Sequence, residues 1–332
     1  MAADPLGGFV PPSRPFAEGT VGDLGEFGVI ARVTAGRRMP PGTVLGPGDD
    51  AAVLAAPDGR VVVCTDVLVE GVHFRLSWST PNQVGRKAVA ANLADVAAMG
   101  AVPTGLVVGL ACPAQTPLAT VDGLVAGMWE EAGKVGVGVV GGDVVSASEL
   151  VVSVTATGDL QGRAPVTRSG ARPGDLLAVC GRLGWAAAGL AVLGRGFRSP
   201  VAVVTAHRVP EPPYPAGPAA AEAGASAMID VSDGLLADAG HLAAGSGVAV
   251  NVNSAALEVP RRLAEVASAL GADPLHWVLT GGEDHALLAS FPAGVGLPAG
   301  WSPIGVVHEG HGVTVDGRAY EGPAGWDHFD GR

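Results

Sequence analysis

Short apolar runs that end near glycine or aspartate alternate along this chain with longer segments of helical character. The β-branched run 60–65 and the apolar run 227–231 predict buried strands. Thr80-Pro81 predicts a helix start, because Thr is a good N-cap and Pro suits the first helical position, and that helix should run to about Met99. Alternation of this kind predicts an α/β (α+β) fold in which helices pack on sheets.

The remaining elements are expected on the same grounds. Strands are expected at 102–110, 136–140, 150–157 and 175–180, and helices at 118–135, 185–193, 261–270 and from the Ser-Asp-Gly at 232–234 to about residue 244. The segment 207–218 is dense in proline, so no regular structure is expected there.

The length of 332 residues indicates two domains of ordinary size. Residues 1–20 are rich in Pro, Gly and Ala and are expected to form a loose tail. A polar stretch at 158–174 suggests a boundary, which gives an N-terminal domain over 21–160 and a C-terminal domain over 161–332.

The overall charge and the cysteine content narrow the classes of function. A formal net charge of -12 argues against nucleic acid or an anionic membrane as the main partner. The three cysteines are far apart and fit neither a zinc spacing nor a disulfide framework, which favours a reducing cytoplasm. We find no run of 18 apolar residues and no signal-peptide pattern at the N-terminus.

Several aspartates occupy positions where strands end or helices begin. These are Asp50, Asp66, Asp143, Asp230 and Asp233, while the neighbouring Asp49 fits better as a turn residue. A sixth, Asp95, lies on the helix expected from Pro81, one turn after Asn92 and on the same face. Ligands gather at strand ends in α/β architectures, so these carboxylates could converge. Two carboxylates about 4 Å apart repel by roughly 1–4 kcal/mol, so such a cluster requires protons or cations. Mg²⁺ prefers oxygen ligands and combines carboxylates with substrate phosphates.

Each aspartate taken singly would more often be a turn residue or a helix cap. Six in one chain with only 16% charged residues together favour a metal and phosphate site. The chain has no P-loop motif and no protein-kinase motif, so it would bind a nucleotide by another route.

A series of motifs resembles the thiamine-monophosphate kinase family of the aminoimidazole ribonucleotide synthetase superfamily. In order they are GPGDDAA (46–52), CTDVLVEGVHF (64–74), KAVAANLADVAAMGA (87–101), GGD (141–143), TRSGARPGD (167–175), DVSDGL (230–235), GGEDH (281–285) and GWDHF (325–329). The resemblance spans about residues 22–329. It implies phosphorylation of thiamine monophosphate by ATP, with direct in-line transfer and several magnesium ions. It also implies a homodimer in which the N-terminal mixed α/β domains form a shared β-barrel.

The matching motif positions imply the site residues. Mg²⁺ would be held by Asp50, Thr65, Asp66, Asp95, Asp143, Asp230 and Asp233, among which Asp66, Asp143 and Asp233 are expected to be catalytic. ATP would contact Gly142, Asp143, Arg168 and Ser232. Thiamine monophosphate would contact His73, Glu283 and Trp326.

Each of these residues has a simpler structural interpretation beside the functional one. Arg168 could be a solvated surface residue, or its planar guanidinium could grip a phosphate. Trp326 could seal the core, or its ring could face the cationic thiazolium. His73 could be a core histidine, and Glu283 a carboxylate at a helix start.

The chain departs from the family pattern at two informative positions. Cys64 stands where a small hydroxyl residue or Ala is common, which argues against a side-chain metal ligand there. His285 replaces the Tyr that commonly follows GGED. Two alternatives stay open: another ATP-dependent enzyme of the same superfamily, or a nucleotide-binding regulator without catalysis. An early Cys, expected for selenophosphate chemistry, and a terminal Cys, expected for hydrogenase maturation, are both missing from this sequence.

Overall fold

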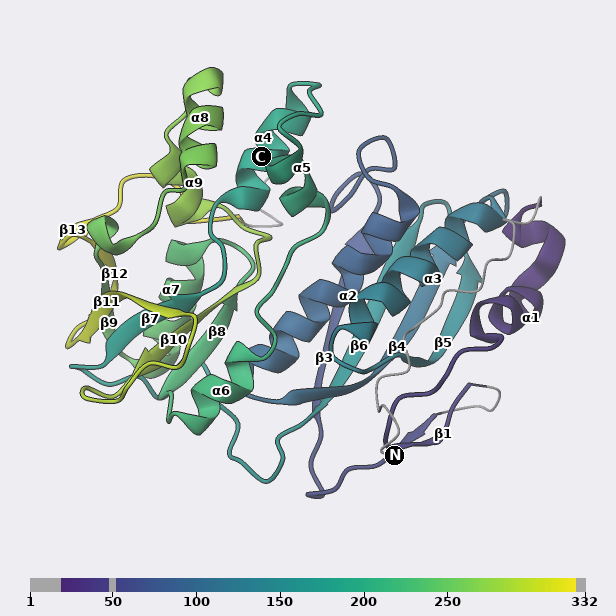
Figure 1. The fold of residues 1–332 in the computed structure, drawn as a ribbon, viewed down its shortest axis with the longest axis horizontal. Helices are drawn as coiled ribbons and strands as arrows, with labels where there is room; N and C mark the ends of the chain where they lie inside the picture. Colours follow the sequence, from purple (N-terminus) through teal and green to yellow (C-terminus); the bar gives the residue numbers. More distant parts are fainter. Residues whose placement is uncertain (1–18, 48–51, 327–332) are drawn as a thin grey trace, which may run out of the picture. The chain divides into compact units, whose positions relative to one another are not determined.

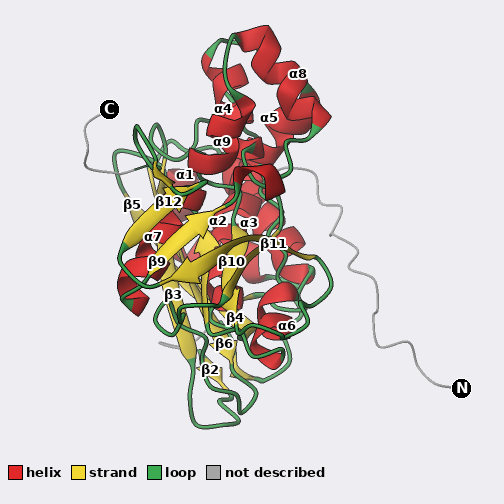
Figure 2. Cartoon of the chain, turned by 90° about the vertical axis from the view of Figure 1, so that its left-hand side faces the viewer, coloured by secondary structure: helices red, strands yellow, loops and turns green. Residues whose placement is uncertain are grey.

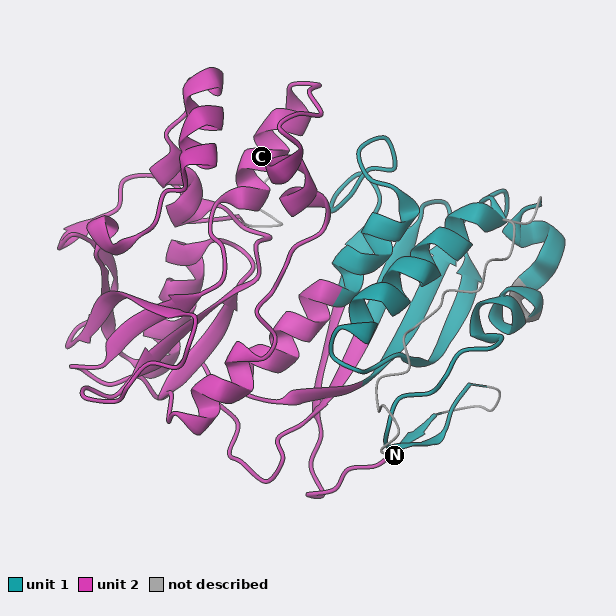
Figure 3. Ribbon diagram, viewed as in Figure 1, with its two compact units in different colours: residues 1–54, 67–89, 105–154 teal, residues 55–66, 90–104, 155–332 magenta. Residues whose placement is uncertain are grey.

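A computed structural model describes residues 19–47 and 52–326 of the chain (Figure 1). It divides into two compact units that interleave along the sequence (Figure 3). Unit 1 comprises Met1–Leu54, Val67–Val89 and Gly105–Val154, and unit 2 comprises Ala55–Asp66, Ala90–Thr104 and Thr155–Arg332. The contiguous domains expected from the sequence stay a prediction.

Unit 1 contains helices, a short hairpin and part of a four-stranded sheet. Its elements are α1 (Val21–Thr34), β1 (Thr43–Leu45), β2 (Val53–Leu54), α3 (Leu118–Gly133) and β5 (Val139–Ser146). Four further elements have residues in both units: α2 (Pro81–Ala98), β3 (Val62–Val69), β4 (Val102–Cys112) and β6 (Val151–Asp159). The strand order of this sheet is β3-β6-β4-β5, and β4 and β5 run parallel.

Unit 2 is built on a seven-stranded sheet in the order β13-β12-β9-β11-β7-β10-β8. Its strands are β7 (Leu176–Cys180), β8 (Ala227–Val231), β9 (Ala249–Val252), β10 (Ala286–Phe291), β11 (Trp301–His308), β12 (Gly312–Val315) and β13 (Arg318–Ala319). Strands β9, β10 and β11 are labelled in Figure 2. β12 and β9 run parallel, whereas β10 pairs antiparallel with β7 and β8, β11 with β7 and β9, and β12 with β13.

The helices of unit 2 are α4 (Trp185–Gly194), α5 (Val201–Arg208), α6 (Ala216–Glu222), α7 (Leu235–Ser246), α8 (Arg261–Leu270) and α9 (Pro274–Thr280), with a 3₁₀ turn at Ser254–Ala256. All six residues of β10 are buried. Phe291 and Trp301 pack edge-to-face in the core beside this sheet, with ring centroids 5.4 Å apart. Among the described residues, no helix has the length and hydropathy needed to cross a bilayer.

The mixed α/β architecture expected from the sequence is confirmed, but three local predictions are wrong. The strand expected at 136–140 is β5 at Val139–Ser146, so Asp143 lies within a strand and does not follow one. The strand expected at 60–65 is β3 at Val62–Val69, which places Asp66 in its middle. Both strands continue past the residues that the pattern treated as an end.

The third wrong prediction concerns the proline-dense segment 207–218. Its beginning belongs to α5, and α6 begins at Ala216 and contains Pro218. Pro218 is tolerated because it stands in the first turn of α6, where backbone N–H groups have no partner within the helix.

Candidate active site

Three segments that are far apart in the sequence meet within unit 2. They are the loop between β8 and α7, the GGEDH segment before β10, and Gly325-Trp326. Their main chains bond directly: Glu283 N–H donates to Ser232 O (2.7 Å), His285 N–H to Val231 O (3.0 Å) and Trp326 N–H to Asp233 O (3.0 Å). The structure therefore brings together four predicted site residues: Ser232, Asp233, Glu283 and Trp326.

Glycines allow this close approach of backbones. A Cβ on Gly282 would lie 2.4 Å from Ser232 O, and a Cβ on Gly325 would lie 2.5 Å from Asp233 O. Glu283 and His285 have φ values of 66° and 52°, a region that non-glycine residues seldom adopt. Backbone strain of this kind persists only where the surroundings enforce it.

Three predicted metal ligands also converge within unit 2. Asp66 comes from β3, Asp95 from α2 and Asp230 from β8. Burial raises the pKa of Asp95 to about 7, and the charges of Asp230 and Asp66 contribute to the rise. Burial also raises the pKa of Asp66, where the charge of Asp230 adds to the effect and His285 opposes it. The carboxylates of Asp66 and Asp230 are therefore close enough to Asp95 to oppose its ionisation.

Asn92, one turn before Asp95 on α2, ties this cluster to β3. Its side-chain oxygen accepts the backbone N–H of Asp66 at 3.1 Å. The Cys64 thiol donates to the carbonyl oxygen of Asn92 at 3.3 Å. Burial, followed by the charges of Asp95 and Asp66, raises the pKa of Cys64, so the thiol keeps its proton.

His285 contacts the cluster through Asp230. Its Nδ1 lies 3.0 Å from Asp230 Oδ2, and both side chains are buried. Burial alone would lower the pKa of His285, but the hydrogen bond to Asp230 and the charge of that carboxylate raise it overall. The sequence marked His285 only as a departure from the family pattern.

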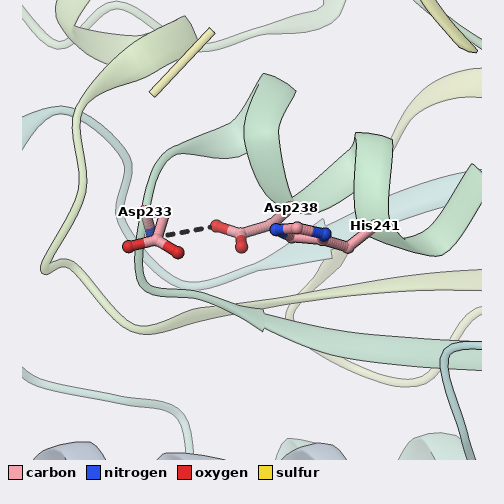
Figure 4. Close-up of side chains that lie close together, drawn as sticks. All are labelled: Asp233, Asp238 and His241. Carbon is pink, nitrogen blue, oxygen red and sulfur yellow. Dashed lines mark hydrogen bonds between the residues drawn. The ribbon is translucent and has the colours of Figure 1, made fainter. Parts of the chain in front are cut away.

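Asp233 has two neighbours that sequence reasoning missed, Asp238 and His241 on the first turns of α7 (Figure 4). One ligand atom from each of the three residues lies within 4.8 Å of the others. Asp238 Oδ2 also accepts the N–H groups of Asp233 and Gly234, each at 3.1 Å. Burial, then the charges of Asp230 and Asp233, raise the pKa of Asp238 to about 7. The spacing of Asp238 and His241, three residues apart on one helix, is a signal that could have found them.

Glu283, a predicted substrate contact, also has a partner that the sequence did not indicate. Its Oε2 lies 3.6 Å from Nδ1 of His207, a buried residue of α5. His207 falls in the segment from which no regular structure was expected, so it was not considered as a site residue.

Unit 1 contains two of the residues predicted to contact ATP, Gly142 and Asp143, side by side in β5. The parallel register sets Gly142 opposite Val108, and a Cβ at Gly142 would lie 2.2 Å from Val108 O. The exposed Asp143 accepts the N–H of Val144 at Oδ1, 2.8 Å away. Close packing of β4 against β5 therefore requires glycine at position 142.

His73, also in unit 1, lies in the turn after β3. Its Nδ1 accepts the backbone N–H of Val69 at 3.0 Å, and its carbonyl oxygen accepts Nζ of the buried Lys87 at 3.2 Å. Because Nδ1 is the acceptor, the neutral ring carries its hydrogen on Nε2.

The remaining predicted residues lie elsewhere. Thr65 precedes Asp66 in β3, so their side chains point to opposite faces of the strand, and the Thr65 hydroxyl accepts that of Thr155 at 3.1 Å. Arg168 is exposed, and its carbonyl oxygen accepts the Ser246 hydroxyl at 2.9 Å. Asp50 lies outside the described residues. The roles assigned to these residues, and to Gly142, Asp143 and His73, stay predictions.

The donor set in unit 2 fits magnesium. Asp66, Asp95 and Asp230 offer carboxylate oxygens, which hard divalent cations prefer. Their mutual repulsion, visible in the raised pKa of Asp95, is the kind that a bound cation relieves.

Comparison with known proteins gives a consistent result. A family model described as AIR synthase related protein, N-terminal domain, matches residues 48–160. The thiamine-monophosphate kinase of Mycobacterium tuberculosis is 57% identical over 312 residues, which cover 93% of each chain. That of Corynebacterium glutamicum is 43% identical over 93% of this chain and 95% of its own. A solved structure described as AaThiL complexed with AMPPCP and TMP is 33% identical, with a TM-score of 0.77, over 92% of this chain and 98% of the other.

Proposed function

The chain belongs to the thiamine-monophosphate kinase family, and from that premise we propose that it transfers the γ-phosphoryl group of ATP to the phosphate of thiamine monophosphate. The products are ADP and thiamine diphosphate. Transfer is direct and in line: a phosphate oxygen of thiamine monophosphate attacks the γ-phosphorus as the bond to ADP breaks.

One structural observation supports this proposal most strongly. Asp66, Asp95 and Asp230 come from three separate elements and gather in one cluster, in which burial and the neighbouring carboxylates raise the pKa values of Asp66 and Asp95. Carboxyl groups with perturbed pKa values cluster at functional sites, because bringing like charges together costs free energy unless a bound cation offsets it. The solved structure described with AMPPCP, an analogue of ATP, and TMP supports a nucleotide and a thiamine phosphate as the two ligands.

The accepting group determines what the protein must supply. A phosphate oxygen is already deprotonated near neutral pH, so the reaction needs no strong general base. The protein's task is to position two anions and to neutralise their charge. Gly142, Asp143, Arg168 and Ser232 would contact ATP, and the planar guanidinium of Arg168 is suited to grip a phosphate. Glu283, the exposed Trp326 ring and His73 would hold thiamine monophosphate.

Several magnesium ions complete the proposed site. Asp66, Asp95 and Asp230 would hold them in unit 2 together with Asp233, and Asp50, Thr65 and Asp143 would supply further ligands. Bound magnesium supplies positive charge that offsets the repulsion between the phosphates. Because Thr65 and Asp66 face opposite sides of β3, Thr65 would contribute through its backbone rather than its hydroxyl.

The direct test is turnover by the purified full-length protein. Incubation with ATP, Mg²⁺ and thiamine monophosphate should yield ADP and thiamine diphosphate in equal amounts, measured by chromatography. Asp143→Asn should abolish product while circular dichroism shows an intact fold. A folded wild-type protein that makes no thiamine diphosphate would refute the proposal, and one that binds ATP without turnover would favour the regulator.

The protein is also proposed to act as a homodimer. Val67 on β3, Val107 on β4 and Val145 on β5 are 47%, 39% and 50% exposed, whereas the adjacent Leu68 and Val108 are buried. These strands therefore show apolar side chains to solvent, and exposed apolar surface of this kind favours association. Light scattering coupled to size exclusion should give the mass of two chains, and Val107→Glu should reduce it to one. A wild-type monomer would contradict the homodimer.

A further inference from the structure

We propose that His285 is a positioning residue for Asp230: its Nδ1–H holds one carboxylate oxygen and leaves the other to a divalent cation. This inference rests on the proposed function, because it assigns His285 a role in preparing a magnesium ligand. His285 itself would touch neither substrate nor metal.

The first argument is the contact itself. His285 Nδ1 and Asp230 Oδ2 are 3.0 Å apart, a good hydrogen-bond distance, and both residues are more than nine-tenths buried. An ionised carboxylate only accepts hydrogen bonds, so Nδ1 carries the hydrogen in this pair. The bond therefore occupies Oδ2 and fixes the plane of the carboxylate.

The second argument is that the backbone holds the imidazole in place. The His285 N–H donates to Val231 O at 3.0 Å, and the next residue, Ala286, pairs with Val231 in the antiparallel ladder. The φ of 52° at His285 is unfavourable for a non-glycine side chain, yet the structure keeps it. The pairing of β10 with β8 therefore keeps the strained backbone of His285 in the position from which its side chain reaches Asp230.

The third argument is the neighbourhood of Asp230. The charges of Asp66 and Asp95 would repel a freely rotating Asp230 carboxylate away from the position where all three can share cations. A fixed N–H donor opposes that rotation. Hydrogen-bond partners of metal ligands commonly change metal affinity or activity by about 10- to 100-fold.

The test compares variants that keep or lose the donor. In His285→Asn the amide nitrogen can take the place of Nδ1, and Asn tolerates positive φ. His285→Gly removes the donor and also the backbone strain, so a loss in this variant cannot be attributed to strain. His285→Leu removes the donor but keeps a side chain of similar size to Asn.

The probe is Mn²⁺ alone, with free ion followed by electron paramagnetic resonance in the nucleotide-free protein. We expect about 10- to 100-fold weaker Mn²⁺ binding in the Gly and Leu variants, and binding close to wild type in the Asn variant. In turnover assays, the Gly and Leu variants should require more Mg²⁺ but regain most of kcat when Mg²⁺ is saturating. A purely structural role would lower kcat at all Mg²⁺ concentrations and lower Tm without metal.

The outcomes separate this inference from the proposed function. Equal Mn²⁺ binding by wild type and the Gly variant overturns the positioning role, even if the wild type makes thiamine diphosphate. Equal weakening in the Asn and Gly variants overturns it as well, since the donor would then be irrelevant. The positioning role is supported if Mn²⁺ binds more weakly to the Gly variant than to wild type and binds to the Asn variant as it does to wild type. That outcome would hold even if the substrate were not thiamine monophosphate.

Discussion

Asp95 and Asp284 both belong to unit 2, and both have a pKa raised to about 7, but their surroundings differ. Asp95 lies in a cluster where, after burial, the main causes of the rise are the carboxylates Asp230 and Asp66. Asp284 is raised by burial alone, and the backbone N–H groups of Ala186 and Gly184 oppose the rise by bonding to it. Asp284 Oδ1 accepts the Ala186 N–H at 2.9 Å, at the start of α4.

The difference between these two aspartates shows that a raised pKa does not by itself identify a reactive site. A buried acid surrounded by backbone donors stabilises a helix start. A buried acid surrounded by other acids creates a demand for cations. Because Asp284 and His285 are adjacent, the GGEDH segment supports the start of α4 through one residue and contacts Asp230 of the cluster through the next.

Loss of a carboxylate from the cluster should have the largest effect. Asp95→Asn should reduce turnover by roughly 100-fold or more, because charge neutralisation by a bound metal contributes several kcal/mol. The metal-free variant should unfold at the same or a higher temperature, because like charges are removed. Asp284→Asn, which keeps an oxygen acceptor, is the matched control and should retain far more activity. Near-normal turnover of Asp95→Asn would remove the cluster from the reaction.

The backbone contact that joins the GGEDH segment to the β8–α7 loop should be nearly as sensitive. In Gly282→Ala the added Cβ would meet Ser232 O at 2.4 Å. We expect a loss of about 1–3 kcal/mol of unfolding free energy, together with reduced turnover. Gly296, which has open space around a Cβ, supplies the control, and Gly296→Ala should change neither urea denaturation nor activity. Equal behaviour of the two variants would show that the contact is unimportant.

Asp284→Ala should affect stability rather than the metal. Removing the carboxylate leaves the Ala186 N–H without its acceptor, at a cost of about 1–3 kcal/mol in urea denaturation. The loss should be the same with and without Mg²⁺. A Mg²⁺-dependent loss would instead group Asp284 with Asp95 as part of the metal site.

The last prediction concerns the part of the pH dependence of stability that responds to Mg²⁺. The pKa of Asp95 rises from 3.8 to about 7 on folding, so the folded protein holds the extra proton between these values. The contribution of Asp95 to stability is therefore fully present below a pH of about 3.8 and is lost as the pH rises toward 7. Mg²⁺ binds the ionised carboxylate and should reduce that loss. Tm measured across this range should show a Mg²⁺-sensitive part that shrinks in Asp95→Asn, while the part due to Asp284 remains. An identical Mg²⁺ effect in wild type and variant would contradict the assignment.

Local chemistry allowed much of the fold to be predicted from the sequence. Thr80-Pro81 marked the start of α2, and the structure shows Thr80 and Gln83 bonding each other's backbone N–H groups there. The end of β5 was misplaced because Gly141-Gly142 resembles a turn. The need for glycine at position 142 arises from the carbonyl of Val108, which only the pairing of β4 with β5 reveals.

The site was predictable in kind but not in its supporting residues. The sequence pattern singled out Asp66, Asp95 and Asp230 as carboxylates that could converge, and resemblance to a family assigned them to magnesium. His207 was missed because its contact with Glu283 is set by packing between elements that are far apart in the sequence. Asp238 and His241 follow Asp233 closely and were overlooked although their helical spacing is visible in the sequence. His285 was noticed only as a substitution, and its contact with Asp230 gave that substitution a physical meaning.

The main-chain bonds that join the three segments of unit 2 also affect the order in which the molecule can fold. They connect Ser232 to Glu283 and Asp233 to Trp326, residues that are far apart in the sequence. Contacts between residues so distant in sequence require closure of long loops before they return any stabilisation, and they therefore form late. During synthesis β8, which contains Asp230, emerges well before the GGEDH segment and Gly325-Trp326. Asp230 and Asp233 are therefore synthesised before the segments whose backbone bonds to the β8–α7 loop.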